Sequence, residues 1–245
     1  MKKQTINSFA DKYSLNGSIE SVIWTINNAD KQIKTASMSD EGNVLCHVYI
    51  KDCAGLADAQ FGIHDTSKLK KLLTVLGEDV NIAFNTRDSK IVSLGLSSED
   101  TDVQYVTADL SVIKQVPPMK KIPEFNLQIP LTKEFIDKFV KAKNALSDVD
   151  YMTFTKDKND KIKLVIGFSK VNSNRINIDV KPIDGKSSLA ETIHFSAKYF
   201  KEILTSNYDC DDAVLKISDA GIAHVEFSND MFNCNYYLIK IKNIE

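Results

Sequence analysis

The sequence contains an internal repeat, and this repeat constrains the fold more than any other feature. Residues 63–76 read IHDTSKLKKLLTVL, and residues 193–204 read IHFSAKYFKEIL. An offset of 130 aligns Ile63 with Ile193, His64 with His194, Thr66 with Ser196, Lys68 with Lys198 and Lys71 with Lys201. Each copy is typical of the end of a strand, a Ser, Thr or Asp cap, and a short helix. The apolar helix faces align better with an offset of 131, so we expect the cap to differ by one residue.

The remaining periodicity predicts a similar plan for both halves of the chain. In the first half we expect a helix over 4–14, a helix over 66–76, and strands over 18–27, 33–38, 44–50, 60–64, 80–85, 91–96 and 103–110. In the second half we expect helices over 132–146 and 197–206, and strands over 125–131, 151–155, 162–168, 175–181, 192–195, 213–218, 222–227 and 231–241. The pattern predicts an α+β fold in which four short helices lie on largely antiparallel sheets.

The segment between the two halves lacks any periodicity. Residues 114–124 contain three prolines, Pro117, Pro118 and Pro123, which disfavour a helix or a central strand. An extended connector is therefore expected here. The predicted organisation is an N-terminal domain over 1–114, a connector over 115–124 and a C-terminal domain over 125–245.

The charge balance limits the classes of partner. A net charge of −2 excludes a generally basic, DNA-coating protein, so any contact with nucleic acid must come from a local patch. Arg87 and Arg175 are the only arginines, and this composition disfavours a function in bidentate reading of guanine. No apolar run reaches the ~18 residues of a membrane span. No signal-peptide core follows Met1, and we expect a cytoplasmic protein without a membrane partner.

Catalytic and metal-binding motifs are absent from the sequence. Cys46, Cys53, Cys210 and Cys234 lack C-x-x-C spacing and are expected to be free thiols in a reducing compartment. The histidines show no helical i, i+4 pair. The acidic cluster 209–212 is more typical of a polar turn than of a metal site. His64 and His194 occupy matched positions, but their differing neighbours favour a structural role over a paired active site. We expect no enzyme activity, no metal and no cofactor.

Lysines recur on the predicted outer faces of three helices. Lys70 and Lys71, Lys138 and Lys141, and Lys198 and Lys201 all lie away from the apolar sides. On any single helix, a solvated charged face is the ordinary explanation. Three such helices in an acidic chain make a common basic surface an equal alternative. Lysines without arginine forks suit non-specific contact with phosphates.

Four segments carry a resemblance to a known family. They are Ile33–Leu45, Phe61–Leu73, Gly167–Val171 and Asn235–Ile241. In sequence and order these segments resemble the DNA polymerase sliding clamps, namely the phage clamps of the T-even type and, more distantly, proliferating cell nuclear antigen. The resemblance extends over nearly the whole chain. It implies two similar clamp-type domains, each with antiparallel sheets outside and two short helices lining a central channel.

The same resemblance implies a ring. Clamps of this length close as head-to-tail homotrimers that encircle duplex DNA, tether a replicative DNA polymerase and are opened by a clamp loader ATPase. By analogy, the channel face would include Lys68, Lys70, Lys71, Lys138, Lys141, Lys198 and Lys201, with Lys12 as a weaker candidate. Encirclement retains such a protein on DNA, so loose lysine contacts would let it slide.

Two further surfaces follow from the resemblance. Subunits would join through edge strands 103–110 and 175–181, with interface residues Val103, Tyr105, Val106, Leu110, Arg175, Ile176, Ile178 and Val180. A partner peptide would bind beneath the connector, against Met38, Leu45, Met119, Ile122, Tyr237 and Ile239. Met38, Leu45 and Tyr237 suit an ordinary core equally well, whereas Met119 and Ile122 lie in a loop that should be exposed.

Two alternatives remain. A monomeric, non-ring processivity or scaffold factor of the same fold would stay monomeric in solution. A hydrolase using His64, His194 or the acidic cluster would show a bound metal or a perturbed histidine pKa in a cleft.

Overall fold

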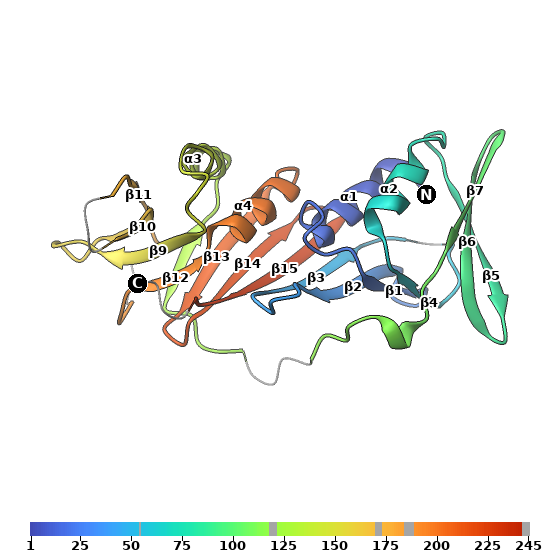
Figure 1. The fold of residues 1–245 in the computed structure, drawn as a ribbon, viewed down its shortest axis with the longest axis horizontal. Coiled ribbons are helices and arrows are strands. Elements are labelled where there is room, and N and C mark those ends of the chain that lie inside the picture. Colours follow the sequence, from blue (N-terminus) through green and yellow to red (C-terminus); the bar gives the residue numbers. More distant parts are fainter. Residues whose placement is uncertain (54, 118–121, 170–172, 184–188, 242–245) are drawn as a thin grey trace. The chain divides into compact units, whose positions relative to one another are not determined.

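The computed structural model describes residues 1–53, 55–117, 122–169, 173–183 and 189–241 (Figure 1). The chain divides into two compact units. The first comprises Met1–Asp40, Cys46–Pro117 and Asp230–Cys234, and the second comprises Glu41–Leu45, Pro118–Asn229 and Asn235–Glu245. No helix among the described residues has both the length and the apolar character that crossing a membrane requires.

The first unit is built from helices α1 and α2 and two antiparallel strand groups. Its elements are α1 (Lys3–Ser14), β1 (Val22–Asn27), β2 (Gln32–Met38), β3 (Val44–Ile50), β4 (Ala59–Ile63), α2 (Thr66–Leu73), β5 (Asn81–Arg87), β6 (Lys90–Ser98), β7 (Thr101–Val106) and the 3-10 turn η1 (Leu110–Val112). The strands follow the orders β4-β1-β2-β3 and β5-β6-β7. An isolated antiparallel bridge joins Lys2, directly before α1, to Asp79, which lies shortly before β5.

An aromatic cluster lies within the core of the first unit. Along β1 the residues alternate between buried and half-buried, which brings Trp24 inward. The Trp24 ring meets Phe9 of α1 at 5.0 Å and Phe61 of β4 at 5.8 Å between centroids. Phe61 in turn lies 5.7 Å from Phe84 of β5. Through these edge-to-face and tilted contacts, the rings join α1 to both strand groups.

The second unit repeats the arrangement. Its elements are β8 (Leu127–Pro130), α3 (Lys133–Ala145), β9 (Tyr151–Lys156), β10 (Ile162–Ile166), β11 (Ile176–Asp179), β12 (Ile193–Ser196), α4 (Ala197–Ser206), β13 (Asp212–Ser218), β14 (Ile222–Ser228) and β15 (Phe232–Ile239). The strand orders are β12-β9-β10-β11 and β8-β13-β14-β15. The two helices meet through Phe139 and Phe200, whose ring centroids are 4.8 Å apart.

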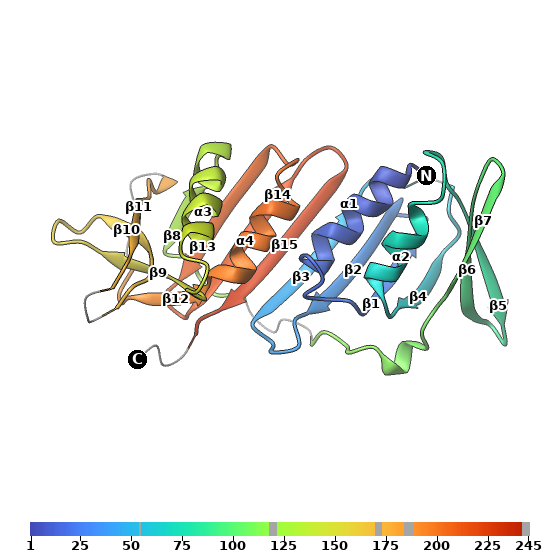
Figure 2. The same cartoon turned by 45° about the horizontal axis from the view of Figure 1, so that its top comes forward.

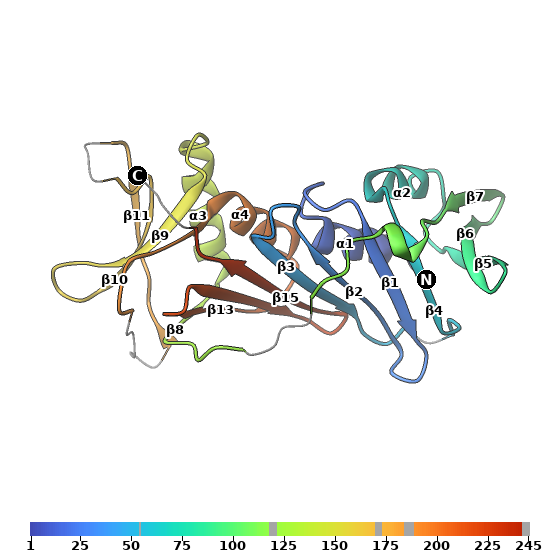
Figure 3. The same ribbon diagram turned by 60° about the horizontal axis from the view of Figure 1, so that its bottom comes forward.

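The two strand orders confirm the internal repeat. The group β4-β1-β2-β3 corresponds element by element to β12-β9-β10-β11, and β5-β6-β7 corresponds to β13-β14-β15. In each unit the two helices run side by side along one face of the strands (Figure 2). Figure 3 shows the strands from the side opposite the helices. The caps of α2 and α4, Asp65 and Ser196, lie 131 positions apart, as the better-aligned helix faces predicted.

Several predicted boundaries were wrong for local reasons. Helix 66–76 was expected, but α2 ends at Leu73 because the Thr74 hydroxyl donates to the Lys71 carbonyl and competes with the helix. The expected strand 18–27 begins only at Val22, because the backbone N–H groups of Ser18 and Ile19 donate back to the end of α1, to the carbonyls of Leu15 at 3.3 Å and Ser14 at 2.9 Å. Both changes shorten an element without altering the topology.

Candidate nucleic-acid interface

Helices α2, α3 and α4 are all anchored by side-chain caps. Asp65 accepts a hydrogen bond from the Lys68 backbone N–H at 2.7 Å, Thr132 accepts from Phe135 at 3.2 Å, and Ser196 accepts from Tyr199 at 3.2 Å. Each cap satisfies a backbone donor that the first turn leaves unpaired. The caps, together with buried faces such as Leu69 and Leu73 on α2, fix which residues point outward.

Five of the seven predicted DNA-facing lysines are exposed. They are Lys68 and Lys71 on α2, Lys138 and Lys141 on α3, and Lys198 on α4. Among the described residues, none of these five ammonium groups has a carboxylate within salt-bridge distance. The Nζ of Lys198 lies 5.9 Å from the centroid of the Tyr199 ring. These five cations are available to bind anions.

The other two predicted lysines are half-buried and have acidic neighbours. Lys70 forms an ion pair with Asp11 of α1. The Lys201 Nζ lies 3.8 Å from a carboxylate oxygen of Glu202, the next residue on α4. The helix faces thus combine free and paired lysines, a difference that the sequence pattern did not reveal.

Lys12, the weaker candidate, does not face solvent. Its side chain is buried, and its Nζ lies 4.8 Å from the centroid of the Phe232 ring, over which it forms a cation–π contact. The prediction that Lys12 contributes to a basic surface was therefore wrong. The apolar stem of a lysine can pack in a core while its charge finds an aromatic face.

The predicted subunit-interface strands both lie at sheet edges. β7 is the last strand of β5-β6-β7, and β11 is the last strand of β12-β9-β10-β11. On β7, Val103 and Tyr105 are buried whereas Val106 is 61% exposed. On and beside β11, Ile178 and Val180 are buried, Ile176 is half-buried and Arg175 is exposed.

Both interface strands are shorter than predicted. β7 ends at Val106, and Leu110 lies instead on η1, where the Asp109 carboxylate accepts a hydrogen bond from the Ser111 N–H at 2.9 Å. β11 spans only Ile176–Asp179, so Arg175 and Val180 flank it. Pro182, which has no N–H to donate, follows shortly afterwards.

The open edge of β7 can be located from its hydrogen bonds. Thr107 N–H donates to the Val92 carbonyl at 3.0 Å, toward β6. Because an antiparallel ladder alternates, the backbone groups of Val106, Gln104 and Asp102 point to the other side. Ala108 already uses that side, since its N–H donates to the Gly62 carbonyl at 2.9 Å. The available edge is therefore the stretch 102–106.

The predicted partner-peptide residues differ in exposure. Ile122 is 57% exposed and Ile239 is 49% exposed, whereas Leu45 and Tyr237 are half-buried. The Tyr237 ring stacks on His224 with centroids 4.2 Å apart and an interplanar angle of 8°. Met38, in the first unit, is also half-buried. Met119 lies outside the described residues.

The two matched histidines have separate local roles. His64 is exposed and packs beside Tyr105, whose hydroxyl also accepts from the backbone N–H of Asp65 at 3.1 Å. His194 Nδ1 lies 2.8 Å from the hydroxyl of Thr153, and burial lowers the pKa of His194. Within the described residues, no group of three His, Cys, Asp or Glu side chains could hold a metal ion.

All four cysteines are buried as free thiols. Burial raises the pKa of Cys46 to about 12, and burial also raises the pKa of Cys53. A raised pKa keeps a thiol protonated and disfavours its reaction as a nucleophile, so we assign Cys46 and Cys53 a role in packing.

The chain forms two compact units with matching strand orders, and a helix pair covers each unit. This arrangement is a clamp-type α+β fold. Comparison with solved structures agrees. The chain is similar to a chain of the structure of the C-terminal region of FEN-1 bound to A. fulgidus PCNA, with a TM-score of 0.73, 14% identity, and coverage of 100% of this chain and 98% of that one. It is also similar to proliferating cellular nuclear antigen from Entamoeba histolytica, with a TM-score of 0.67, 16% identity, and coverage of 98% and 94%.

These neighbours show that the chain has the fold of the PCNA clamps over its full length. No protein-family model and no curated protein sequence matches the chain. The predicted α+β clamp fold is therefore confirmed.

Proposed function

We propose that the chain is a DNA polymerase processivity factor that closes as a homotrimeric ring and slides on duplex DNA. The observation that carries the proposal is the distribution of lysine. In a chain of net charge −2, the outward faces of α2, α3 and α4 carry five exposed lysines for which the described part of the chain supplies no carboxylate partner. A clamp fold and a basic helix surface together favour a protein that surrounds a polyanion.

Weak binding is sufficient for this function. Non-specific DNA contacts have dissociation constants on the order of 10⁻⁴ to 10⁻⁶ M and weaken steeply with salt. A ring does not need stronger contacts, because encirclement prevents dissociation. Lysine ammonium groups, which are hydrated point charges, exchange between phosphates more readily than arginine forks.

Ring closure requires two different surfaces on each chain. The open edge of β7 and the edge strand β11 are such surfaces, and pairing one with the other on the next chain is a head-to-tail contact. Three copies joined in this way would form a closed ring. Pairing would also cover two sheet edges that otherwise invite aggregation.

The proposed partners are duplex DNA, a replicative DNA polymerase, a clamp loader ATPase and two further copies of this chain. The chain itself is proposed to be a scaffold and not an enzyme. The exposed Ile122 and Ile239 support a docking surface for an apolar peptide of a partner. The sequence resemblance to T-even-type clamps favours a phage protein acting in the host cytoplasm.

The test is the solution mass measured by light scattering over a dilution series. We expect a mass near three times 27.4 kDa that falls toward one subunit on dilution. A monomer at every concentration would remove the ring and favour the non-ring processivity factor of the same fold. Activity of the purified chain as a hydrolase, with loss on replacing His64 or His194, would instead support the enzymatic alternative.

A further inference from the structure

The lysines within α1 and directly before it, Lys2, Lys3 and Lys12, all have partners within the first unit. Lys2 Nζ lies 2.8 Å from Asp79, and Lys3 Nζ donates to the Leu76 carbonyl at 2.7 Å and lies 3.5 Å from Glu78. Lys12 is buried over Phe232. Helix α1 therefore offers no exposed, unpaired lysine to a ligand. Its lysine content, counted with the residue directly before the helix, is nevertheless no lower than that of α2 or α4.

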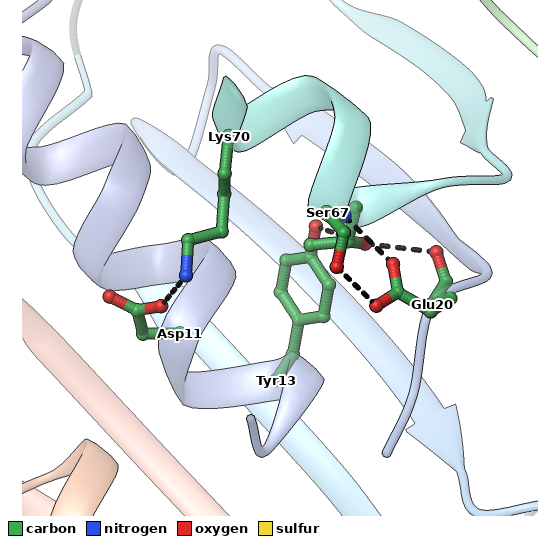
Figure 4. A network of polar contacts seen from close by, with 6 residues as sticks. Asp11, Tyr13, Glu20, Ser67 and Lys70 are labelled. Carbon is green, nitrogen blue, oxygen red and sulfur yellow. Dashed lines mark hydrogen bonds and ion pairs between the residues drawn. The ribbon is translucent and has the colours of Figure 1, made fainter. Parts of the chain in front are cut away.

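The charged side chain that α1 exposes most is acidic. Asp11 is 47% exposed at its side chain, and its Oδ1 accepts a hydrogen bond from Lys70 Nζ of α2, whose side chain is 38% exposed. Figure 4 shows the Lys70 side chain extending from α2 toward α1, where it meets the Asp11 carboxylate. The ion pair joins the two helices at their accessible side.

The neighbouring residue on α2 provides an internal comparison. Lys71 is exposed, and no carboxylate of the described residues lies within salt-bridge distance of it. Lys70 and Lys71 thus share a helix, a charge and a side-chain length, but only one of them is neutralised. A phosphate that binds Lys71 replaces water and counterions. A phosphate that binds Lys70 must also displace Asp11 or accept its repulsion.

From this contrast we infer that the Asp11 carboxylate competes with DNA phosphates for Lys70. Asp11 thereby weakens the binding of DNA to the helix pair α1 and α2. The inference rests on the proposed function, because it concerns how strongly this basic surface holds duplex DNA. Lys68 and Lys71 then supply the phosphate contacts of the first unit, and Lys70 serves to fix α2 against α1. Asp11 is a positioning residue in this proposal: it holds Lys70 and lowers the affinity for DNA, which eases sliding along the duplex.

The experiment measures binding to a short fluorescein-labelled linear duplex by fluorescence anisotropy over a range of salt concentrations. Asp11→Asn removes the carboxylate charge and frees Lys70. We expect this variant to bind more tightly and to steepen the slope of log K against log salt by about 0.9 for each Lys70 that gains a phosphate. Lys71→Ala should make the slope shallower by a similar amount, whereas Lys70→Ala should leave it unchanged.

Two controls separate a released lysine from a general change of charge. Glu134→Gln removes one negative charge from an exposed position on α3 that has no ion pair within the described residues. The gain from Asp11→Asn should exceed that from Glu134→Gln and should disappear in the double variant Asp11→Asn/Lys70→Ala. Thermal melts of every variant establish that the fold is retained.

The outcomes are distinguishable. Equal losses from Lys70→Ala and Lys71→Ala, or a gain from Asp11→Asn that persists without Lys70, would overturn the inference while leaving the clamp function intact. Absence of any salt-dependent binding by the wild-type ring would overturn the proposed function together with the inference.

Discussion

The Glu20 carboxylate stabilises the first turn of α2 by accepting two hydrogen bonds from Ser67, one from its backbone N–H at 2.8 Å and one from its hydroxyl at 2.6 Å (Figure 4). Asp65 accepts from the next backbone donor, that of Lys68. Two carboxylates therefore satisfy two of the donors that an α-helix leaves unpaired at its start. Their charges also lie at the positive end of the helix dipole.

Replacing this carboxylate should destabilise the first unit. We expect Glu20→Ala to lower the free energy of unfolding by about 1 kcal/mol, as for other lost helix caps. In a chain of this size, such a change corresponds to a drop of about 2–4 °C in melting temperature. Glu124→Ala, at an exposed position without a described partner, is the matched control. Equal melting temperatures for both variants would contradict a capping role for Glu20.

The open edge of β7 should be required for assembly. Val106 is 61% exposed and its backbone faces that edge, so Val106→Asp should not disturb the core of one chain. It would, however, introduce a charge into a pairing of two strands, where desolvation is costly. We expect Val106→Asp to shift the light-scattering mass toward one subunit at concentrations where the wild type is trimeric.

A second valine provides the control for that experiment. Val112 on η1 is 74% exposed and lies outside the stretch 102–106. Val112→Asp should leave the mass unchanged. If both variants stayed trimeric, the edge of β7 would not be the assembly surface.

Topology was predictable from the sequence because the periodic signals were strong and occurred twice. Alternation identified the strand containing Trp24, and the apolar spacing of Leu69 and Leu73 identified α2. The repeated cap and helix fixed the correspondence of the two halves. Element ends were less predictable, because they depend on single hydrogen bonds, such as that of Thr74 with Lys71, that leave no periodic trace.

The candidate interface was predictable as a set of helix faces but not in its detail. Helical spacing places Lys70 and Lys71 outward almost equally, and only the tertiary approach of α1 puts Asp11 beside one of them. The burial of Lys12 likewise depends on Phe232, which lies far away in sequence. A long side chain can reach either solvent or a distant partner, so sequence patterns alone do not decide its environment.

The burial of His194 should make stability depend on pH. Burial lowers the pKa of His194 in the folded chain, and that of His47 moves in the same direction for the same reason. The unfolded chain, with an ordinary histidine pKa of about 6.5, then binds more protons than the folded chain. This histidine contribution to stability is therefore fully present above about pH 6.5 and is lost as the pH falls from that value through the lowered pKa of the folded chain.

This dependence can be measured by chemical denaturation between about pH 7.5 and pH 5.5, around the ordinary histidine pKa. His194→Gln retains a group that can hydrogen bond with Thr153 but does not titrate. We expect its unfolding free energy to fall less steeply with decreasing pH than that of the wild type. Identical slopes for wild type and His194→Gln would show that His194 titrates normally in the folded state.

The exposed isoleucines of the second unit should matter for polymerase processivity and not for folding. Ile122 and Ile239 are about half exposed, so exchanging either for Asp removes little buried surface from the chain itself. A partner peptide that covers one of them would bury roughly half of a side chain whose full burial is worth about 1.5–3 kcal/mol, so its loss should lower the affinity roughly threefold to tenfold. We expect Ile239→Asp to shorten the products of the cognate polymerase on a primed circular template, while trimer mass and DNA binding stay at wild-type values.

Val112→Asp, an equal change on an exposed valine of the first unit, should leave product length unchanged. Full-length products with both Ile122→Asp and Ile239→Asp would place the partner surface elsewhere on the chain.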